Sequence, residues 1–157
     1  MEKRASWRGL TCKELGSDIN KRMNISMPKT LNISVAQMVK NARGKIEEID
    51  AGDVIAMLGK ASVLIVDIRD VRERQRGGHI PGSFHCPRGM AEFWVDPDSP
   101  YYKDIFGRDA KFIFHCASGW RSALTVETLQ QMGFENIAHI KDGFTSWKEA
   151  GGPIEMP

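Results

Sequence analysis

The chain has 157 residues, a length that fits one domain with a sizeable hydrophobic core. Hydrophobic residues make up 41% and charged residues 27% of it, and the formal net charge is +2. These values are typical of a soluble globular protein and imply no general attraction to nucleic acids or membrane surfaces. Since no apolar run is long enough to cross a bilayer, we also expect no membrane-spanning segment.

The cysteine content indicates a reducing environment. There are three cysteines, Cys12, Cys86 and Cys116, and the N-terminus lacks the apolar core of a secretory signal. An odd number of cysteines in that context argues against a disulfide framework. No Cys/His spacing is typical of a zinc site. A cytoplasmic location is therefore the simplest expectation.

Residues 1–31 differ from the rest of the chain. They contain seven Lys/Arg and three Asp/Glu, and their hydrophobic periodicity is poor. We predict a loosely ordered N-terminal extension here, followed by one domain over residues 32–157. A targeting peptide and a partner-binding arm are the alternatives for the extension.

Alternating helical and strand patterns begin at residue 34. The spacing predicts a helix over 34–42 with Ser34 as its N-cap, a strand over 46–49, and a helix over 51–58 capped by Asp50. Residues 63–68 form a nearly continuous apolar run, as expected for a strand that is buried on both faces of a parallel sheet.

The next segment, residues 69–78, is rich in arginine and has two open interpretations. It is either a solvated loop or short helix, or a basic rim that attracts an anionic ligand or an acidic partner protein. A turn over 78–82 and a strand over 83–86 follow, and we expect His79 to tie the turn by hydrogen bonds. Cys86 is expected to pack as a small hydrophobe, with a role as a resolving thiol for Cys116 as the alternative.

The second half continues the alternation. An aromatic-rich insertion at 87–106 is expected to supply core side chains and a wall of the site. Further patterns predict a helix over 122–132, a strand over 136–140 and a helix over 142–150. Strands that alternate with helices across short loops indicate an α/β fold, with a mainly parallel sheet flanked by helices.

The most informative stretch is residues 111–122, where an apolar strand ends in Cys116. A tight loop containing Gly119 follows, and then Arg121 and the helix. Loop and helix N–H groups then point at the cysteine sulfur and favour its anionic form. His115 is a poor candidate for the general base, because neighbouring strand residues point to opposite faces.

The spacing between the cysteine and the arginine distinguishes two kinds of chemistry. Protein tyrosine phosphatases and dual-specificity phosphatases separate the two by five residues, whereas only four separate Cys116 from Arg121. The smaller loop suits a single sulfur atom on the cysteine better than a tetrahedral phosphate. This segment resembles the active loop of the rhodanese (thiosulfate sulfurtransferase) family. Residues 63–69 followed by 78–83 resemble the family's first signature, and residues 133–134 and 142–147 resemble its closing segment, so that three motifs occur in the right order and spacing.

The resemblance implies the rhodanese-like three-layer fold and a sulfurtransferase activity. The matching cysteine of the family carries the transferred sulfur as a persulfide, so Cys116 is the expected catalytic residue. The expected substrate-binding residues are those that follow it: Ala117, Ser118, Gly119, Trp120, Arg121 and Ser122. The partners implied are a small sulfur donor, such as thiosulfate or a persulfide, and a thiol or cyanide acceptor. No metal or organic cofactor is required.

Several alternatives stay open. Arg121 either braces the loop or holds an anionic donor, and Trp120 either packs the loop down or lines the entrance. The chain as a whole could instead be a sulfur-carrier module that receives sulfur from a relay protein. A cysteine-dependent phosphatase or arsenate reductase is the third class, and the short loop speaks against it.

Overall fold

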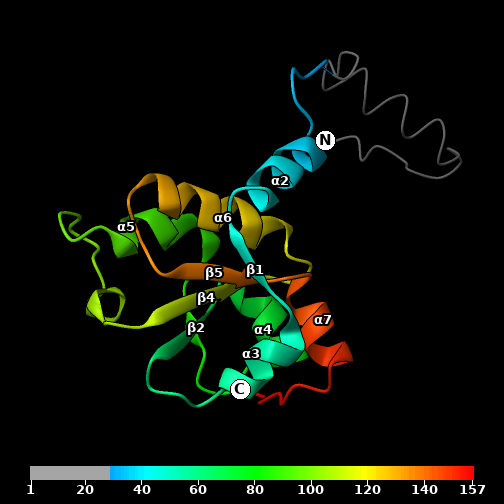
Figure 1. Ribbon diagram of the computed structural model, residues 1–157, viewed down its shortest axis with the longest axis vertical. Coiled ribbons are helices and arrows are strands. Elements are labelled where there is room, and N and C mark those ends of the chain that lie inside the picture. Colours follow the sequence, from blue (N-terminus) through cyan, green and yellow to red (C-terminus); the bar gives the residue numbers. More distant parts are fainter. Residues whose placement is uncertain (1–28) are drawn as a thin grey trace, which may run out of the picture. The chain divides into compact units, whose positions relative to one another are not determined.

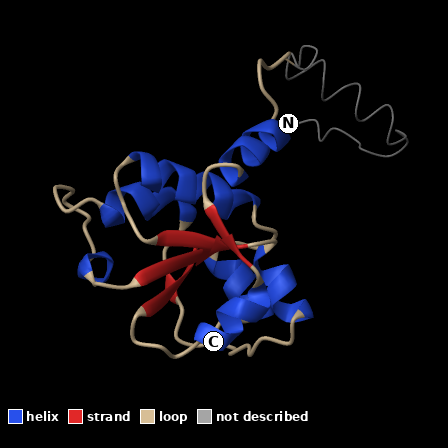
Figure 2. Ribbon diagram, viewed as in Figure 1, coloured by secondary structure: helices blue, strands red, loops and turns tan. Residues whose placement is uncertain are grey.

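The structure is a computed structural model that describes residues 29–157, and it has the predicted α/β architecture. Its five-stranded sheet has the order β1-β5-β4-β2-β3, and all neighbouring strands are parallel (Figure 2). The strands are β1 (Glu47–Ile49), β2 (Val63–Asp67), β3 (Phe84–His85), β4 (Lys111–His115) and β5 (Ile137–Ile140). The prediction of a mainly parallel sheet flanked by helices is therefore confirmed.

Helices cover both faces of the sheet and make three layers (Figure 1). Helices α2, α5 and α6 lie on one face, and α3, α4 and α7 on the other. Their bounds are α2 (Val35–Arg43), α3 (Ala51–Met57), α4 (Val71–Gly77), α5 (Ala91–Val95), α6 (Trp120–Gln131) and α7 (Gly143–Glu149), with 3-10 turns at Arg88–Met90 and Asp104–Gly107. Across residues 29–157, no helix has both the length and the apolar character that crossing a membrane requires. The predicted extension at residues 1–31 falls almost wholly outside the described residues and stays a prediction.

Most element boundaries follow from local chemistry. Ser34 caps α2 as predicted, because its hydroxyl accepts a hydrogen bond from the N–H of Gln37 at 3.1 Å. Asp50 occupies the N-cap position of α3 as predicted, but its carboxylate makes no capping bond and lies 3.8 Å from Lys141 Nζ instead. Helix α6 begins two residues earlier than predicted, because Gly119 adopts φ +85° and lets the chain enter the helix directly.

Strand β4 lies in the middle of the sheet, and its side chains alternate between two separate cores. Phe112 and Phe114 pack beneath α6 and α5, whereas Ile113 packs on the other face with Trp147 of α7. Because the alternation has a period of two, Cys116 falls on the α6 side and His115 on the α7 side.

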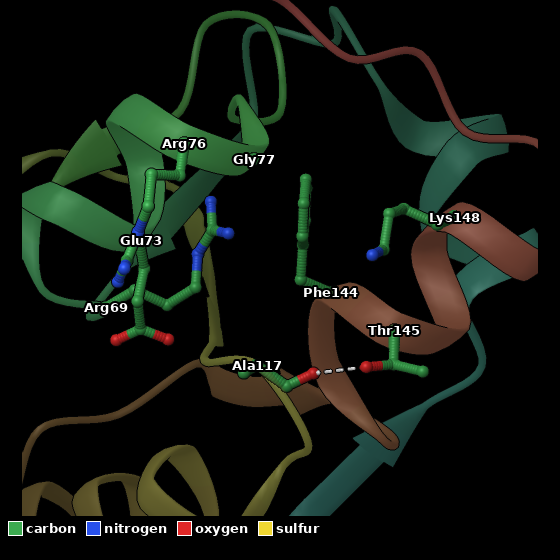
Figure 3. Close-up of a pocket in the computed structure, with 8 residues that line it drawn as sticks. All are labelled: Arg69, Glu73, Arg76, Gly77, Ala117, Phe144, Thr145 and Lys148. Carbon is green, nitrogen blue, oxygen red and sulfur yellow. Dashed lines mark hydrogen bonds between the residues drawn. The ribbon is translucent and has the colours of Figure 1, made fainter.

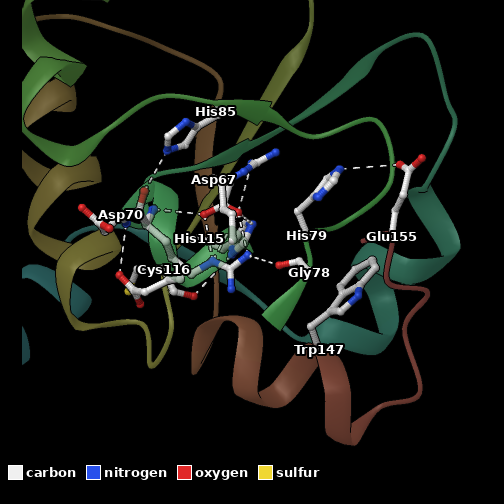
Figure 4. Close-up of polar contacts among 12 residues, drawn as sticks. Asp67, Asp70, Gly78, His79, His85, His115, Cys116, Trp147 and Glu155 are labelled. Atoms are coloured by element: carbon white, nitrogen blue, oxygen red, sulfur yellow. Dashed lines mark hydrogen bonds and ion pairs between the residues drawn. The ribbon is translucent and has the colours of Figure 1, made fainter. Parts of the chain in front are cut away.

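A buried ion pair closes the α7 side of the sheet at the carboxyl end of β2. Asp67, labelled in Figure 4, is fully buried. It accepts hydrogen bonds from Nε and Nη2 of Arg69, at 3.0 and 2.8 Å. Arg74 Nη1 also donates to this carboxylate, at 3.1 Å. Burial is the largest single effect and raises the pKa of Asp67, but the hydrogen bonds and charge of Arg69, together with nearby His115, outweigh it and hold that pKa below its usual value. The interpretation of residues 69–78 as a basic rim is therefore wrong for Arg69 and Arg74, whose guanidinium groups neutralise a buried carboxylate.

Two histidines complete this polar cluster. His115 is fully buried, stacks on Phe144 and has its Nε2 3.7 Å from Asp67 Oδ2. Burial lowers its pKa to about 4 in spite of the nearby Asp67. His79 forms an antiparallel bridge to Glu155 near the C-terminus, with Nε2 3.6 Å from Oε2 (Figure 4). This contact agrees with the structural role expected for His79.

The His115 site predicts an acid-sensitive fold. Because the folded-state pKa of His115, about 4, lies below the usual value of 6.5, the unfolded chain binds more protons between these two pH values. The free energy of unfolding should therefore fall as the pH drops through that window, by up to about 3 kcal/mol from this residue. Urea denaturation at several pH values should show a shallower pH dependence in His115→Asn than in the unmodified protein. An equally steep dependence in the variant would assign the acid sensitivity to other groups.

Candidate active site

Cys116 lies where the central strand ends and helix α6 is about to begin. Its side chain is fully buried, and its Sγ accepts a hydrogen bond from the backbone N–H of Gly119 at 3.2 Å. This bond is possible because the chain turns back within three residues, through the left-handed conformation of Gly119. The start of a twelve-residue helix therefore faces the sulfur, as the sequence predicted.

Helix α7 fixes the other side of the loop. The N–H of Phe144 donates to the carbonyl of Cys116 at 2.8 Å, and the N–H of Thr145 donates to that of Ala117 at 3.0 Å. The Thr145 hydroxyl donates to the same Ala117 carbonyl at 3.1 Å (Figure 3). Because the carbonyl and N–H of a trans peptide unit point in opposite directions, the N–H groups of Ala117 and Ser118 are directed away from α7.

The remaining loop residues differ in exposure. Ser118 is exposed, and Trp120 keeps 45% of its surface exposed at the start of α6, which argues against a role in packing the loop down. Ser122, in contrast, is fully buried, and its Oγ lies 3.6 Å from Cys116 Sγ. The structure thus brings Gly119 and Ser122 to the sulfur and leaves Trp120 at the surface.

Arg121 is engaged by a carboxylate from another helix. Its Nη1 and Nη2 each donate to one oxygen of Glu73 on α4, both at 2.8 Å. These hydrogen bonds lower the pKa of Glu73 and raise the pKa of Arg121, and the neighbouring Cys116 adds to the latter effect. The geometry fits the bracing role and leaves the guanidinium beside the sulfur.

A chain of polar groups extends from the sulfur to the edge of the sheet. Ser122 Oγ is 2.9 Å from Nδ1 of His139 on β5, and His139 Nε2 is 2.8 Å from Oε2 of Glu48 on β1. Sequence analysis assigned no role to His139 or Glu48. The available signal was a histidine within an apolar strand, but a sequence does not show that this strand lies between β1 and the active loop.

A pocket of about 280 Å³ opens beside the loop at Ala117 (Figure 3). Phe144 forms one wall, and the guanidinium carbon of Arg69 lies 3.9 Å from the centre of its ring. Arg76 and Lys148 contribute positive charge to the pocket. Such a pocket favours an anionic ligand.

Cys86 occupies a different environment. It is fully buried in the core beneath α6, and burial raises the pKa of its thiol to about 12. A thiol in that state is a poor nucleophile at neutral pH. Its environment therefore agrees with the expected packing role. Over residues 29–157, no three His, Cys, Asp or Glu side chains are grouped so that they could hold a metal ion.

A buried cysteine at a strand end, bound by the N–H of Gly119 at the start of a helix and near the guanidinium of Arg121, is suited to nucleophilic attack on an anionic molecule. Comparison with known proteins identifies the class. The rhodanese-like domain family matches residues 50–150, and the chain therefore belongs to that family. The family membership predicted from the sequence is confirmed.

The names of two similar proteins agree with this assignment, and a third protein is described differently. A Pseudoalteromonas translucida relative named thiosulfate sulfurtransferase GlpE is 30% identical over 105 residues, which cover 66% of this chain and 90% of the relative. A rhodanese-related protein from Thermoplasma volcanium superposes with a TM-score of 0.58 at 30% identity, over 71% of this chain and 99% of that one. A Rhodopseudomonas palustris protein of unknown function, described as a possible tyrosine phosphatase, superposes with a TM-score of 0.79 at 52% identity, over 83% of this chain and 100% of that one.

The contact between α7 and the loop predicts a strict requirement for glycine at position 143. A Cβ at Gly143, where φ is +63°, would lie 2.5 Å from the Cys116 carbonyl oxygen. Gly143→Ala should therefore cost both backbone strain and a displaced loop, about 2–5 kcal/mol in all by denaturant unfolding. Gly82→Ala is the matched control, because Gly82 has φ +72° and open space around it, and it should cost only about 1–2 kcal/mol. Equal costs for the two variants would contradict the close approach of α7.

Proposed function

We propose that this protein is a sulfurtransferase that accepts sulfane sulfur on Cys116 as a persulfide and passes it to a thiol or to cyanide. The observation that carries the proposal is the position of Cys116 Sγ, which ends the central strand and accepts the Gly119 N–H at 3.2 Å. The N–H groups of Ala117 and Ser118, directed away from α7, are available to stabilise the extra sulfur. The names of the thiosulfate sulfurtransferase relatives support thiosulfate as one donor.

The reaction needs two displacement steps. The Cys116 thiolate attacks the outer sulfur of thiosulfate, the sulfur–sulfur bond of the donor breaks, and sulfite leaves with the electron pair. An acceptor thiolate or cyanide then attacks the terminal sulfur of the persulfide, and the Cys116 thiolate departs. The oxidation level of the cysteine is restored, so the cycle is ping-pong and requires no cofactor.

A cysteine-dependent phosphatase is the second candidate, because the 52% identical Rhodopseudomonas palustris protein is described as a possible tyrosine phosphatase. An aryl phosphate tests for the phosphatase activity, and thiosulfate tests for the sulfurtransferase activity. Release of phosphate from an aryl phosphate that disappears in Cys116→Ser would favour the phosphatase. We expect none, since four residues between Cys116 and Arg121 leave a smaller cradle than the five of phosphatases.

The central prediction concerns the mass of the protein after incubation with thiosulfate. Mass spectrometry should find one added sulfur atom on the peptide that contains Cys116, and Cys116→Ser should gain none. Cys86→Ala is the matched control, because it removes the other cysteine that is buried among residues 29–157, and it should load and turn over normally. The proposal fails if Cys116 gains no sulfur from thiosulfate or from any of several persulfide donors.

A further prediction separates the two roles of Arg121. Arg121→Ala should slow loading from thiosulfate by roughly ten- to a hundredfold, because a charge-assisted hydrogen bond to the dianion is lost. Loading from a neutral donor should slow less. Single-turnover persulfide formation gives the rates, and thermal unfolding gives the stability of the same samples.

Glu73→Ala provides the comparison, because it breaks the same ion pair and leaves the guanidinium in place. It should load thiosulfate faster than the unmodified protein, since a negative charge leaves the site. If Glu73→Ala instead slows loading as much as Arg121→Ala, Arg121 acts only as a brace between α6 and α4.

A further inference from the structure

In the hydrogen-bonded path from Cys116 to Glu48, the contacts determine which atom carries each proton. The Glu48 carboxylate can only accept, so the proton on His139 lies on Nε2, 2.8 Å from Glu48 Oε2. Nδ1 is then free to accept the hydroxyl proton of Ser122, whose oxygen is 2.9 Å away. The Ser122 oxygen in turn lies 3.6 Å from Cys116 Sγ, and with its own proton donated to His139 it can accept the thiol proton.

Protein encloses most of this hydrogen-bonded path from Cys116 to Glu48. Ser122, His139 and Cys116 are fully buried, whereas 24% of the Glu48 side chain is exposed. Burial lowers the pKa of His139, and its hydrogen bond to Glu48 opposes that shift. A neutral imidazole that can still be protonated has the properties of a proton acceptor.

Helix α2 holds the outer end of the chain. Arg43 lies 3.4 Å from Glu48 and 2.9 Å from Asp142, which precedes α7. These two charges, together with Glu48 and Cys116, are the titratable and charged groups that face His139 from the elements around it. Arg43 and Glu48 precede residue 50, where the match to the family begins, so this end of the chain of contacts lies outside the matched region.

We propose that His139 is a positioning residue that receives the Cys116 thiol proton through Ser122, with Glu48 stabilising the imidazolium that forms. The S–H bond of Cys116 breaks and its proton passes to Ser122 Oγ, while the Ser122 hydroxyl proton passes to His139 Nδ1. The result is a thiolate and an imidazolium, with Ser122 unchanged and no other reactant consumed. The role of the thiolate as a sulfur carrier rests on the function proposed above.

The test measures thiolate formation directly, without sulfur transfer. Iodoacetamide alkylates a thiolate, so the rate of modification of the Cys116 peptide, followed by mass spectrometry from pH 5 to 10, reports how readily the thiol loses its proton. His139→Asn keeps a polar group near Ser122 but cannot accept a proton. It should lower the rate roughly tenfold at pH 7 and move the midpoint upward by about one pH unit, with rates that converge at high pH.

His115→Asn is the matched control, because it removes another fully buried histidine, next to Cys116 in the sequence but on the opposite face of the sheet. It should keep the midpoint of the unmodified protein. Glu48→Gln retains a hydrogen-bond acceptor without the charge, and because Glu48 is partly exposed this variant tests the proposal even if His139→Asn does not fold. It should shift the midpoint in the same direction by a smaller amount. A midpoint that is unchanged in folded His139→Asn, or in Glu48→Gln where the histidine variant does not fold, overturns the proposal.

The two proposals fail independently. If alkylation depends on His139 but no donor loads sulfur, the proton path stands and the sulfurtransferase proposal falls. If sulfur loads on Cys116 with the same pH dependence in His139→Asn, the loop alone activates the thiol and the proton path falls.

Discussion

The active loop depends on the way in which its own carbonyl groups are bound by the start of α7. Helix α7 donates N–H groups to the carbonyls of Cys116 and Ala117, and each of these bonds turns the attached peptide N–H away from α7. The loop can therefore offer donors to a sulfur atom without leaving buried carbonyls unpaired. A Cβ at position 143 would lie 2.5 Å from the Cys116 carbonyl oxygen, so this close approach of the helix depends on glycine there.

The central strand separates two polar networks that have different roles. On the α7 face, Asp67 and Arg69 neutralise each other in full burial, and removing one partner would leave a buried charge without compensation. On the α6 face, Ser122 and His139 make a chain of hydrogen bonds that begins at the sulfur of Cys116 and reaches the protein surface only at its outer end. The first network fixes the geometry at the carboxyl end of the sheet, whereas the second contains groups that can exchange protons.

Strands and the faces of their side chains depend on neighbouring residues and could be predicted from the sequence. Contacts between residues far apart in the sequence could be found only in the structure. The apolar runs located the buried strands, and alternation along β4 correctly placed His115 on the face away from Cys116. The partner of Arg121 was not predictable, because 48 residues separate it from Glu73. The role of Arg69 was also missed, since an arginine in a polar segment indicates exposure, and only the position of β2 shows that a carboxylate is buried beside it.

The charges around the loop also restrict which molecules can approach the sulfur. The positive charge of Arg121 is largely offset by Glu73, so an incoming anion competes with that carboxylate for the guanidinium. Arg76 and Lys148 lie on the walls of the neighbouring pocket, where an anion can bind before it competes. Cys116 is fully buried and is not among the residues that line this pocket, which meets the loop at Ala117.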